Sequence, residues 1–110
     1  MRTIPIPVDT DKLVFTCVKA PRPRILNKET GEIKLDKTGQ AVFEVTVSVE
    51  DDFDRIELAK IGVSGEPPIK VGDSVIPVGL VGYVWEVGGR WGISYRAASF
   101  QQARKAGDHA

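Results

Sequence analysis

Residues 74–100 read SVIPVGLVGYVWEVGGRWGISYRAASF, and this stretch carries the strongest fold signal in the chain. Valine, isoleucine and aromatic residues dominate it, which is the composition typical of β-strands. A tight turn at Gly88-Gly89 or Gly89-Arg90 divides the stretch in its middle. The stretch therefore predicts a hairpin of two long strands, Ser74–Val87 and Trp91–Phe100.

Three further strands are predicted in the part of the chain that precedes this hairpin, at Leu13–Val18, Ala41–Val49 and Arg55–Ile61. The short alternating piece Glu32–Leu35 lies between two glycine-containing turn signals and predicts an extra small hairpin. Regular pairing is expected to end at Ala20–Arg24, because its two prolines cannot donate to a strand ladder. The period-two alternation of a half-buried strand runs through Phe43, Val45, Val47 and Val49, and again through Ile56 and Leu58.

The pattern of elements predicts the fold class. A chain of 110 residues allows one domain, and runs of strands without a convincing helix favour a β-sandwich or a small barrel. Gly79 and Gly82 interrupt the longest strand and provide the curvature that a tight barrel needs. We therefore expect an all-β, five-stranded OB-fold-like small barrel with an extra short hairpin over residues 1–100. Residues 101–110 are expected to form a flexible C-terminal tail.

Composition excludes several classes of function. Fifteen Lys and Arg balance fifteen Asp and Glu, so any binding of nucleic acid must come from a local patch. Cys17 is the only cysteine and His109 the only histidine, which excludes an intramolecular disulfide, a cysteine-based zinc site and catalysis by an internal imidazole. No catalytic triad, phosphate loop or carboxylate pair can be assembled, so we expect no enzyme activity, no cofactor and no metal. Without a membrane span or signal peptide, a cytoplasmic protein with no membrane partner is predicted.

Two resemblances add to this interpretation. Val71–Val75, Val78–Leu80, Trp85, the Gly89-Arg90 turn and Ser94–Ala97 resemble the last two strands of single-strand DNA-binding OB-folds. The chain as a whole resembles a family of small proteins encoded on actinobacterial plasmids and integrative conjugative elements, whose members are labelled regulatory. The matching segments are Arg2–Pro5, Thr30–Glu32, Gly39–Val49, Gly65–Pro67 and Tyr95–Ala97. These resemblances imply a DNA-binding protein that acts in plasmid replication, transfer or their regulation.

A basic segment is the first candidate binding feature. Arg22, Arg24, Lys28 and Lys34 cluster with few acids nearby, and residues 1–39 hold eight basic and five acidic side chains. Residues 40–60 hold two basic and six acidic side chains, so charge is unevenly distributed despite the zero net charge. The basic side chains could form a groove wall that follows phosphates, or simply a solvated hairpin that keeps the protein soluble.

The aromatic residues of the final hairpin are the second candidate feature. Tyr83 and Trp85 share one face of their strand, and Trp91 is expected to lie near Trp85 across the turn. An exposed aromatic pair flanked by Arg90 or by Arg96 would make a stacking surface for bases. A small barrel also needs large side chains in its core, so we expect one tryptophan in the core and the other exposed.

Two other features have structural interpretations. The acidic loop Glu50–Asp54 lacks the spaced ligands and central glycine of a calcium loop, and an edge-blunting role is favoured over a cation site. Cys17 lies in an apolar strand, which predicts a buried, inert thiol.

The leading hypothesis is a module of a mobile element that binds single-stranded DNA with little sequence preference and that could act as a homodimer. The alternative is a protein–protein adaptor that regulates a plasmid replication or transfer protein. The zero net charge and the exposed strand edges favour this alternative. A β-ribbon repressor is a third option. The candidate nucleic-acid-binding residues are Arg22, Arg24, Lys34, Tyr83, Trp85, Arg90, Trp91 and Arg96.

Overall fold

The structure is a computed structural model, and it describes residues 4–103. In chain order its elements are β1 (Ile6–Pro7), the 3-10 helix η1 (Thr10–Lys12), β2 (Val14–Pro23), β3 (Ile25–Asn27), β4 (Glu32–Ile33), β5 (Val42–Glu50), β6 (Ile56–Ser64), β7 (Ser74–Val78), β8 (Val81–Val87), β9 (Arg90–Ala97) and β10 (Ser99–Gln102). The all-β prediction is confirmed. The helical part of residues 4–103 is the short η1, so no helix there could span a bilayer.

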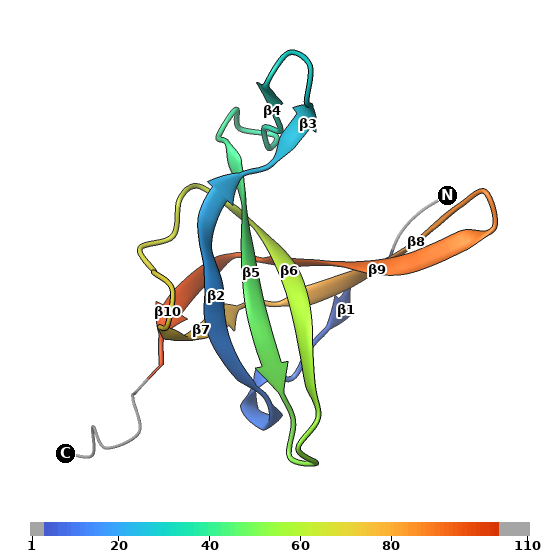
Figure 1. The fold of residues 1–110 in the computed structure, drawn as a ribbon. Helices are drawn as coiled ribbons and strands as arrows, with labels where there is room; N and C mark the ends of the chain where they lie inside the picture. Colours follow the sequence, from blue (N-terminus) through green and yellow to red (C-terminus); the bar gives the residue numbers. More distant parts are fainter. Residues whose placement is uncertain (1–3, 104–110) are drawn as a thin grey trace.

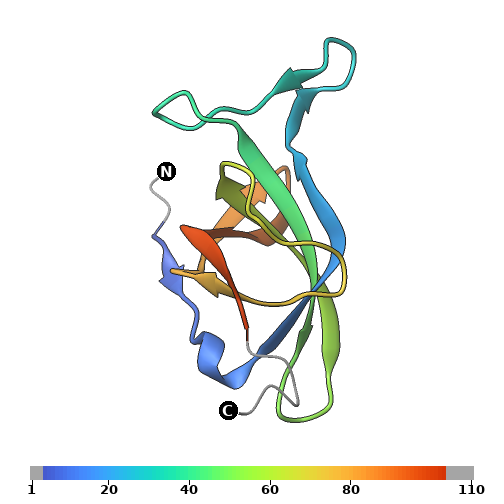
Figure 2. The same ribbon diagram turned by 90° about the vertical axis from the view of Figure 1, so that its left-hand side faces the viewer.

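One curled sheet forms the body of the molecule. Its eight strands follow the order β1-β8-β9-β6-β5-β2-β7-β10, and every pair is antiparallel except β6 with β9. β7 and β8 are successive parts of one run of chain, as are β9 and β10, so the sheet bends back on itself into a half-barrel (Figures 1 and 2). β3 and β4 form a separate two-stranded hairpin that extends from one end of this body (Figure 1).

Both strands of the predicted long hairpin are divided by a corner. The first breaks at Gly79, whose φ of +66° suits glycine, and the second breaks at Ala98. The two breaks meet, because the Ala98 N–H donates to the Val78 carbonyl at 2.8 Å. The predicted bend at Gly79 is therefore present, and it lets β7 pair with β2 and β10 while β8 pairs with β9 and β1.

The proline segment interrupts regular pairing, as predicted, but it does not end the strand. β2 continues through Pro21 to Pro23, which lies opposite Phe43 of β5. Two register shifts, between Cys17 and Lys19 and between Lys19 and Arg22, interrupt the ladder along this part of the strand. Irregular pairing of this kind accommodates prolines because it leaves residues that need not donate to the partner strand.

The core lies on the concave side of the sheet. The alternation predicted for β5 is confirmed, and Val45 and Val47 are fully buried. The alternation predicted for β6 is wrong, since Ile56 and Leu58 are 61% and 70% exposed. The pairing of β6 with β5 sets Val45 opposite Ile61, which turns the odd-numbered residues of β6 inward. The buried core cluster consists of Phe15, Cys17, Val45, Val47, Ile61, Val63, Ile69, Val75, Leu80, Ala97 and Phe100.

Cys17 is buried, as the sequence predicts. Burial is the main reason that the pKa of its thiol is raised, and the nearby Asp73 carboxylate adds to the effect. A thiol in this environment stays protonated at neutral pH, so it acts as a small apolar core group.

Candidate nucleic-acid interface

A junction of three chain segments holds two of the predicted basic residues at the base of the β3–β4 hairpin. The Arg24 N–H donates to the Val42 carbonyl at 2.9 Å, and the Val42 N–H donates to the Lys34 carbonyl at 2.8 Å. The Lys34 N–H donates in turn to the Arg24 carbonyl at 2.8 Å. This ring of backbone hydrogen bonds fixes Arg24 and Lys34 close together, where β5 begins.

The turn that leads into β5 is fixed by a carboxylate. Asp36 Oδ1 accepts hydrogen bonds from the Thr38 N–H at 2.8 Å, the Thr38 hydroxyl at 2.7 Å and the Gln40 N–H at 3.0 Å. The hydrogen bonds from Thr38 and from the Ser64 side chain hold the pKa of Asp36 well below its usual range. Asp36 therefore has a structural role beside Lys34.

Arg96 of β9 joins the two cations on the same side of the sheet. It lies opposite Gly62 of β6, and a Cβ atom added at Gly62 would lie 3.8 Å from the Arg96 Cγ. Burial lowers the pKa of Lys34, and the charges of Arg24 and Arg96 lower it further. Three cations therefore share one small region, on the side of the sheet away from the core.

Two further residues extend this region along the same side. Arg22 lies opposite Glu44, and Lys60 Nζ is 4.0 Å from Glu44 Oε1. A shallow groove of about 450 Å³ runs beside them, and its lining includes Arg24, Glu44, Lys60 and Ser94. We call the set Arg22, Arg24, Lys34, Lys60 and Arg96 the basic outer face.

The β8–β9 hairpin carries the aromatic residues away from the body (Figure 1). Its turn is the predicted glycine pair, with φ of +57° at Gly88 and +81° at Gly89. Residues directly opposite in an antiparallel pair point to the same side of the sheet. Trp85 lies opposite Gly92 and Val87 opposite Arg90, and Tyr83 lies opposite Ser94 in the same alternation. One face of the hairpin therefore carries Tyr83, Trp85, Arg90 and Arg96, and it continues the basic outer face.

Trp85 lies flat against the backbone of the neighbouring strand. A side chain added at Gly92 would meet the Trp85 ring atoms Cζ2, Cε2 and Nε1 at 2.6, 2.8 and 3.0 Å. The glycine thus allows the indole to approach β9 closely. The side chain still remains 42% exposed, so the indole is held in place with surface free for contact.

Trp91 lies on the other face. It is opposite Glu86 and is 70% exposed, and Val84 and Ile93 are its neighbours on that face. Two predictions are therefore wrong: neither tryptophan is in the core, and the two do not face each other across the hairpin. The reason is the register, because the turn sets residue 85 opposite residue 92 and leaves Trp91 pointing the opposite way.

The acidic loop after β5 forms a compact turn. Asp51 Oδ1 accepts from the N–H groups of Phe53 and Arg55 at 2.8 and 3.0 Å, and the Arg55 side chain donates to Asp51 Oδ2 at 2.9 Å. Mainly because of the backbone hydrogen bond from Arg55, the pKa of Asp51 is lowered. Within residues 4–103 no group of His, Cys, Asp and Glu side chains is arranged to hold a metal ion.

The structure brings seven of the eight predicted residues onto one face, and Trp91 is the exception. Lys60 and Glu44 were not predicted as part of this region. Each lies at an outward position of an alternating strand, but only the β5–β6 register shows that they meet. In comparisons with known proteins, neither a family model nor a curated protein matches the chain.

Proposed function

We propose that this protein binds single-stranded DNA with little sequence preference, through the basic outer face and Trp85. The observation that carries the proposal is the continuity of one face, on which Arg24, Lys34 and Arg96 lead to an indole held against Gly92. Cations that follow the phosphates combined with an aromatic surface on which bases stack are the usual means of binding a single strand.

The order of the long strands supports an OB-fold for this site. Five long runs of chain succeed one another, namely β2, β5, β6, β7–β8 and β9–β10. OB-folds bind oligonucleotides across their second and third strands, between the loops that join strands one to two and four to five. Here the corresponding strands are β5 and β6, and the corresponding loops contain the β3–β4 hairpin and the Gly88-Gly89 turn. The basic outer face lies in that region.

A single strand fits this face better than a duplex. Stacking on Trp85 requires a base whose flat surface is free. In a duplex the neighbouring base pairs cover that surface, so a base is available only in an unpaired strand or after the duplex is unstacked. The zero net charge of the chain gives no global attraction to duplex DNA, so binding depends on this local patch. The resemblance to plasmid and conjugative-element proteins is our basis for proposing replication or transfer of a mobile element, or its regulation, as the setting.

An oligo-dT titration followed by tryptophan fluorescence at low salt tests the proposal. The Trp91→Phe variant leaves Trp85 as the only indole, so the signal reports one position. We expect quenching that weakens as salt is added, because phosphate contacts release counterions. A duplex of equal length is the control and should quench less. Absence of quenching with oligo-dT up to about 100 µM, the weak end of non-specific binding, would contradict the proposal.

A further inference from the structure

One half of β6 has an open edge. Ile61–Val63 pairs with β9, whereas in the part of the chain that the structure describes Ile56–Lys60 pairs with β5 alone. The strand diverges from β9 here, as the ribbon shows (Figure 1). Alternate N–H and C=O groups along such an edge point away from the sheet and are available to another strand.

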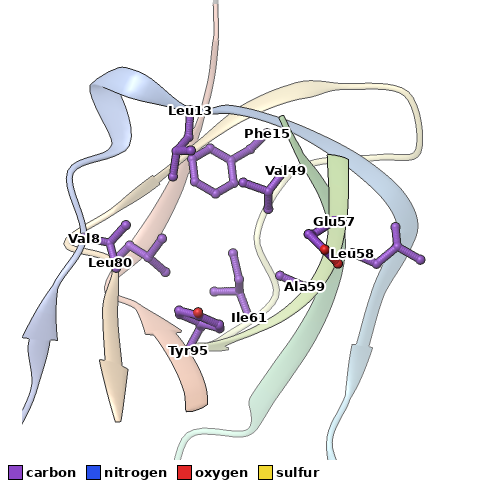
Figure 3. Close-up of a pocket in the computed structure, with 10 residues that line it drawn as sticks. All are labelled: Val8, Leu13, Phe15, Val49, Glu57, Leu58, Ala59, Ile61, Leu80 and Tyr95. Carbon is purple, nitrogen blue, oxygen red and sulfur yellow. The ribbon is translucent and has the colours of Figure 1, made fainter. Parts of the chain in front are cut away.

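An apolar cavity lies directly inside this edge. Its volume is about 380 Å³, within the range of about 300–1,000 Å³ that ligand pockets occupy. Figure 3 shows the side chains that line it: Val8, Leu13, Phe15, Val49, Glu57, Leu58, Ala59, Ile61, Leu80 and Tyr95. Three of them, Glu57 to Ala59, are consecutive, although neighbouring side chains of a strand point to opposite sides. The cavity therefore reaches the edge of β6 itself.

Negative charge lies at one side of the mouth of the cavity. Glu57 is exposed and lies opposite Val49, so it shares the inward-facing side of β6 at the rim. The acidic loop Glu50–Asp54 begins just beyond, and only Asp51 within it has a cationic partner, Arg55, among the ion pairs of residues 4–103. An occupant with basic groups near this end of β6 would be favoured.

We propose that the open edge of β6, Ile56–Lys60, accepts an extended peptide that adds one strand to the sheet. The peptide places one large aliphatic or aromatic side chain in the cavity and basic side chains beside Glu57 and the acidic loop. The inference does not rest on the proposed DNA binding, because the cavity lies on the inner side of β6. The two sites are neighbours and share Lys60, which ends the open edge and also belongs to the basic outer face.

A peptide fits these features better than a free apolar molecule. Strand addition uses backbone hydrogen bonds for affinity and side-chain pockets for specificity. Here the open edge of β6 offers the hydrogen bonds, and the cavity directly inside that edge offers the pocket. A peptide in extended form points every second side chain to the same side, so one residue can enter the cavity while its neighbours remain in solvent. A fatty acid would fill the cavity and leave the peptide groups of Ile56–Lys60 unused.

Selection from a displayed library of random linear peptides tests the proposal, with the wild-type protein as target. Val49→Phe is the counter-target, because it fills the cavity from β5. Glu57→Lys inverts the charge at the rim, and its exposed position keeps the fold intact. We expect the selected peptides to share one large apolar residue with a Lys or Arg two positions away. They should bind both variants at least about tenfold less tightly, and binding should protect the amides of Ile56–Lys60 from hydrogen exchange.

Oligo-dT binding measured on the same variants separates this inference from the proposed function. Both variants should bind oligo-dT as the wild type does, whereas Arg24→Ala should bind oligo-dT more weakly and bind the peptides as the wild type does. Peptides that bind Val49→Phe and Glu57→Lys as tightly as the wild type would overturn the proposal. So would decanoate bound in the cavity while no peptide is selected, which would indicate a site for small apolar molecules.

Discussion

The two tryptophans of the β8–β9 hairpin occupy opposite faces of the same ribbon. Trp85 lies against Gly92, on the face that continues to Arg96 and the basic outer face. Trp91 is more exposed, but it lies opposite Glu86 among apolar neighbours. Exposure alone would favour Trp91 as the binding residue. The charges and contacts around each indole favour Trp85 instead.

This difference shows what a stacking residue needs. An indole that already packs against the backbone loses little side-chain entropy when a base covers its free surface. Cations on the same face can then hold the phosphates on either side of that base. The face of Trp91 leads instead toward Tyr95, which points into the apolar cavity (Figure 3).

The largest expected effect comes from removing each tryptophan in turn. Trp85→Ala should weaken oligo-dT binding by about 1–3 kcal/mol, or about 5- to 150-fold, because the stacking surface is lost. Trp91→Ala should change the affinity less than about twofold. Anisotropy of a labelled oligo-dT measures both, and thermal melting checks that each variant is folded. A greater loss for Trp91→Ala would reverse the assignment of the two faces.

Adding a methyl group to one face of the β8–β9 hairpin should reduce oligo-dT affinity by a smaller amount. Gly92→Ala places a Cβ 2.6 Å from the Trp85 ring, so the indole must move off β9. We expect a loss of affinity below that of Trp85→Ala. Gly82→Ala is the matched control, because its Cβ would meet Ile93 and Tyr95 on the opposite face. Equal losses of oligo-dT affinity in the two variants would show that the position of the Trp85 ring is irrelevant.

Single arginines should have a modest effect that depends on salt. Arg24→Ala and Arg96→Ala should each lower the slope of log K against log salt by about 1, whatever the sequence of the oligonucleotide. Lys12 in η1 lies outside the basic outer face, so Lys12→Ala should leave the slope unchanged. Titrations at several salt concentrations measure the slopes. The same slope in Lys12→Ala and Arg24→Ala would mean that the cations of the basic outer face have no special role.

The smallest effect is a pH dependence that comes from Lys34. Burial and two arginines lower the pKa of Lys34, so as pH rises this side chain loses its proton at a lower pH than a lysine free in water would. Oligo-dT affinity should therefore decline between pH 7 and about pH 10, the usual pKa of lysine. Lys34→Arg keeps the charge and should flatten this part of the profile. An identical decline in Lys34→Arg would rule out Lys34 as the titrating group.

Local patterns in the sequence were sufficient for several features. β-rich composition predicts the all-β fold, the glycine pair predicts the hairpin turn, and the alternation of β5 predicts its buried side. Each of these depends on residues close together in the chain. The predicted basic and aromatic residues lie almost all on one face, although whether they bind DNA stays a prediction.

Tertiary structure alone decided which faces meet. In β6 the apolar residues Ile56 and Leu58 point one way and Ile61 points the other, and pairing with β5 determines which set is buried. The parallel pairing of β6 with β9 brings the charge of Arg96 close to Lys34, and no local sequence pattern predicts that the two are near each other. Alternation within a strand defines two faces but assigns neither to the core, because a shift of one residue in register exchanges them.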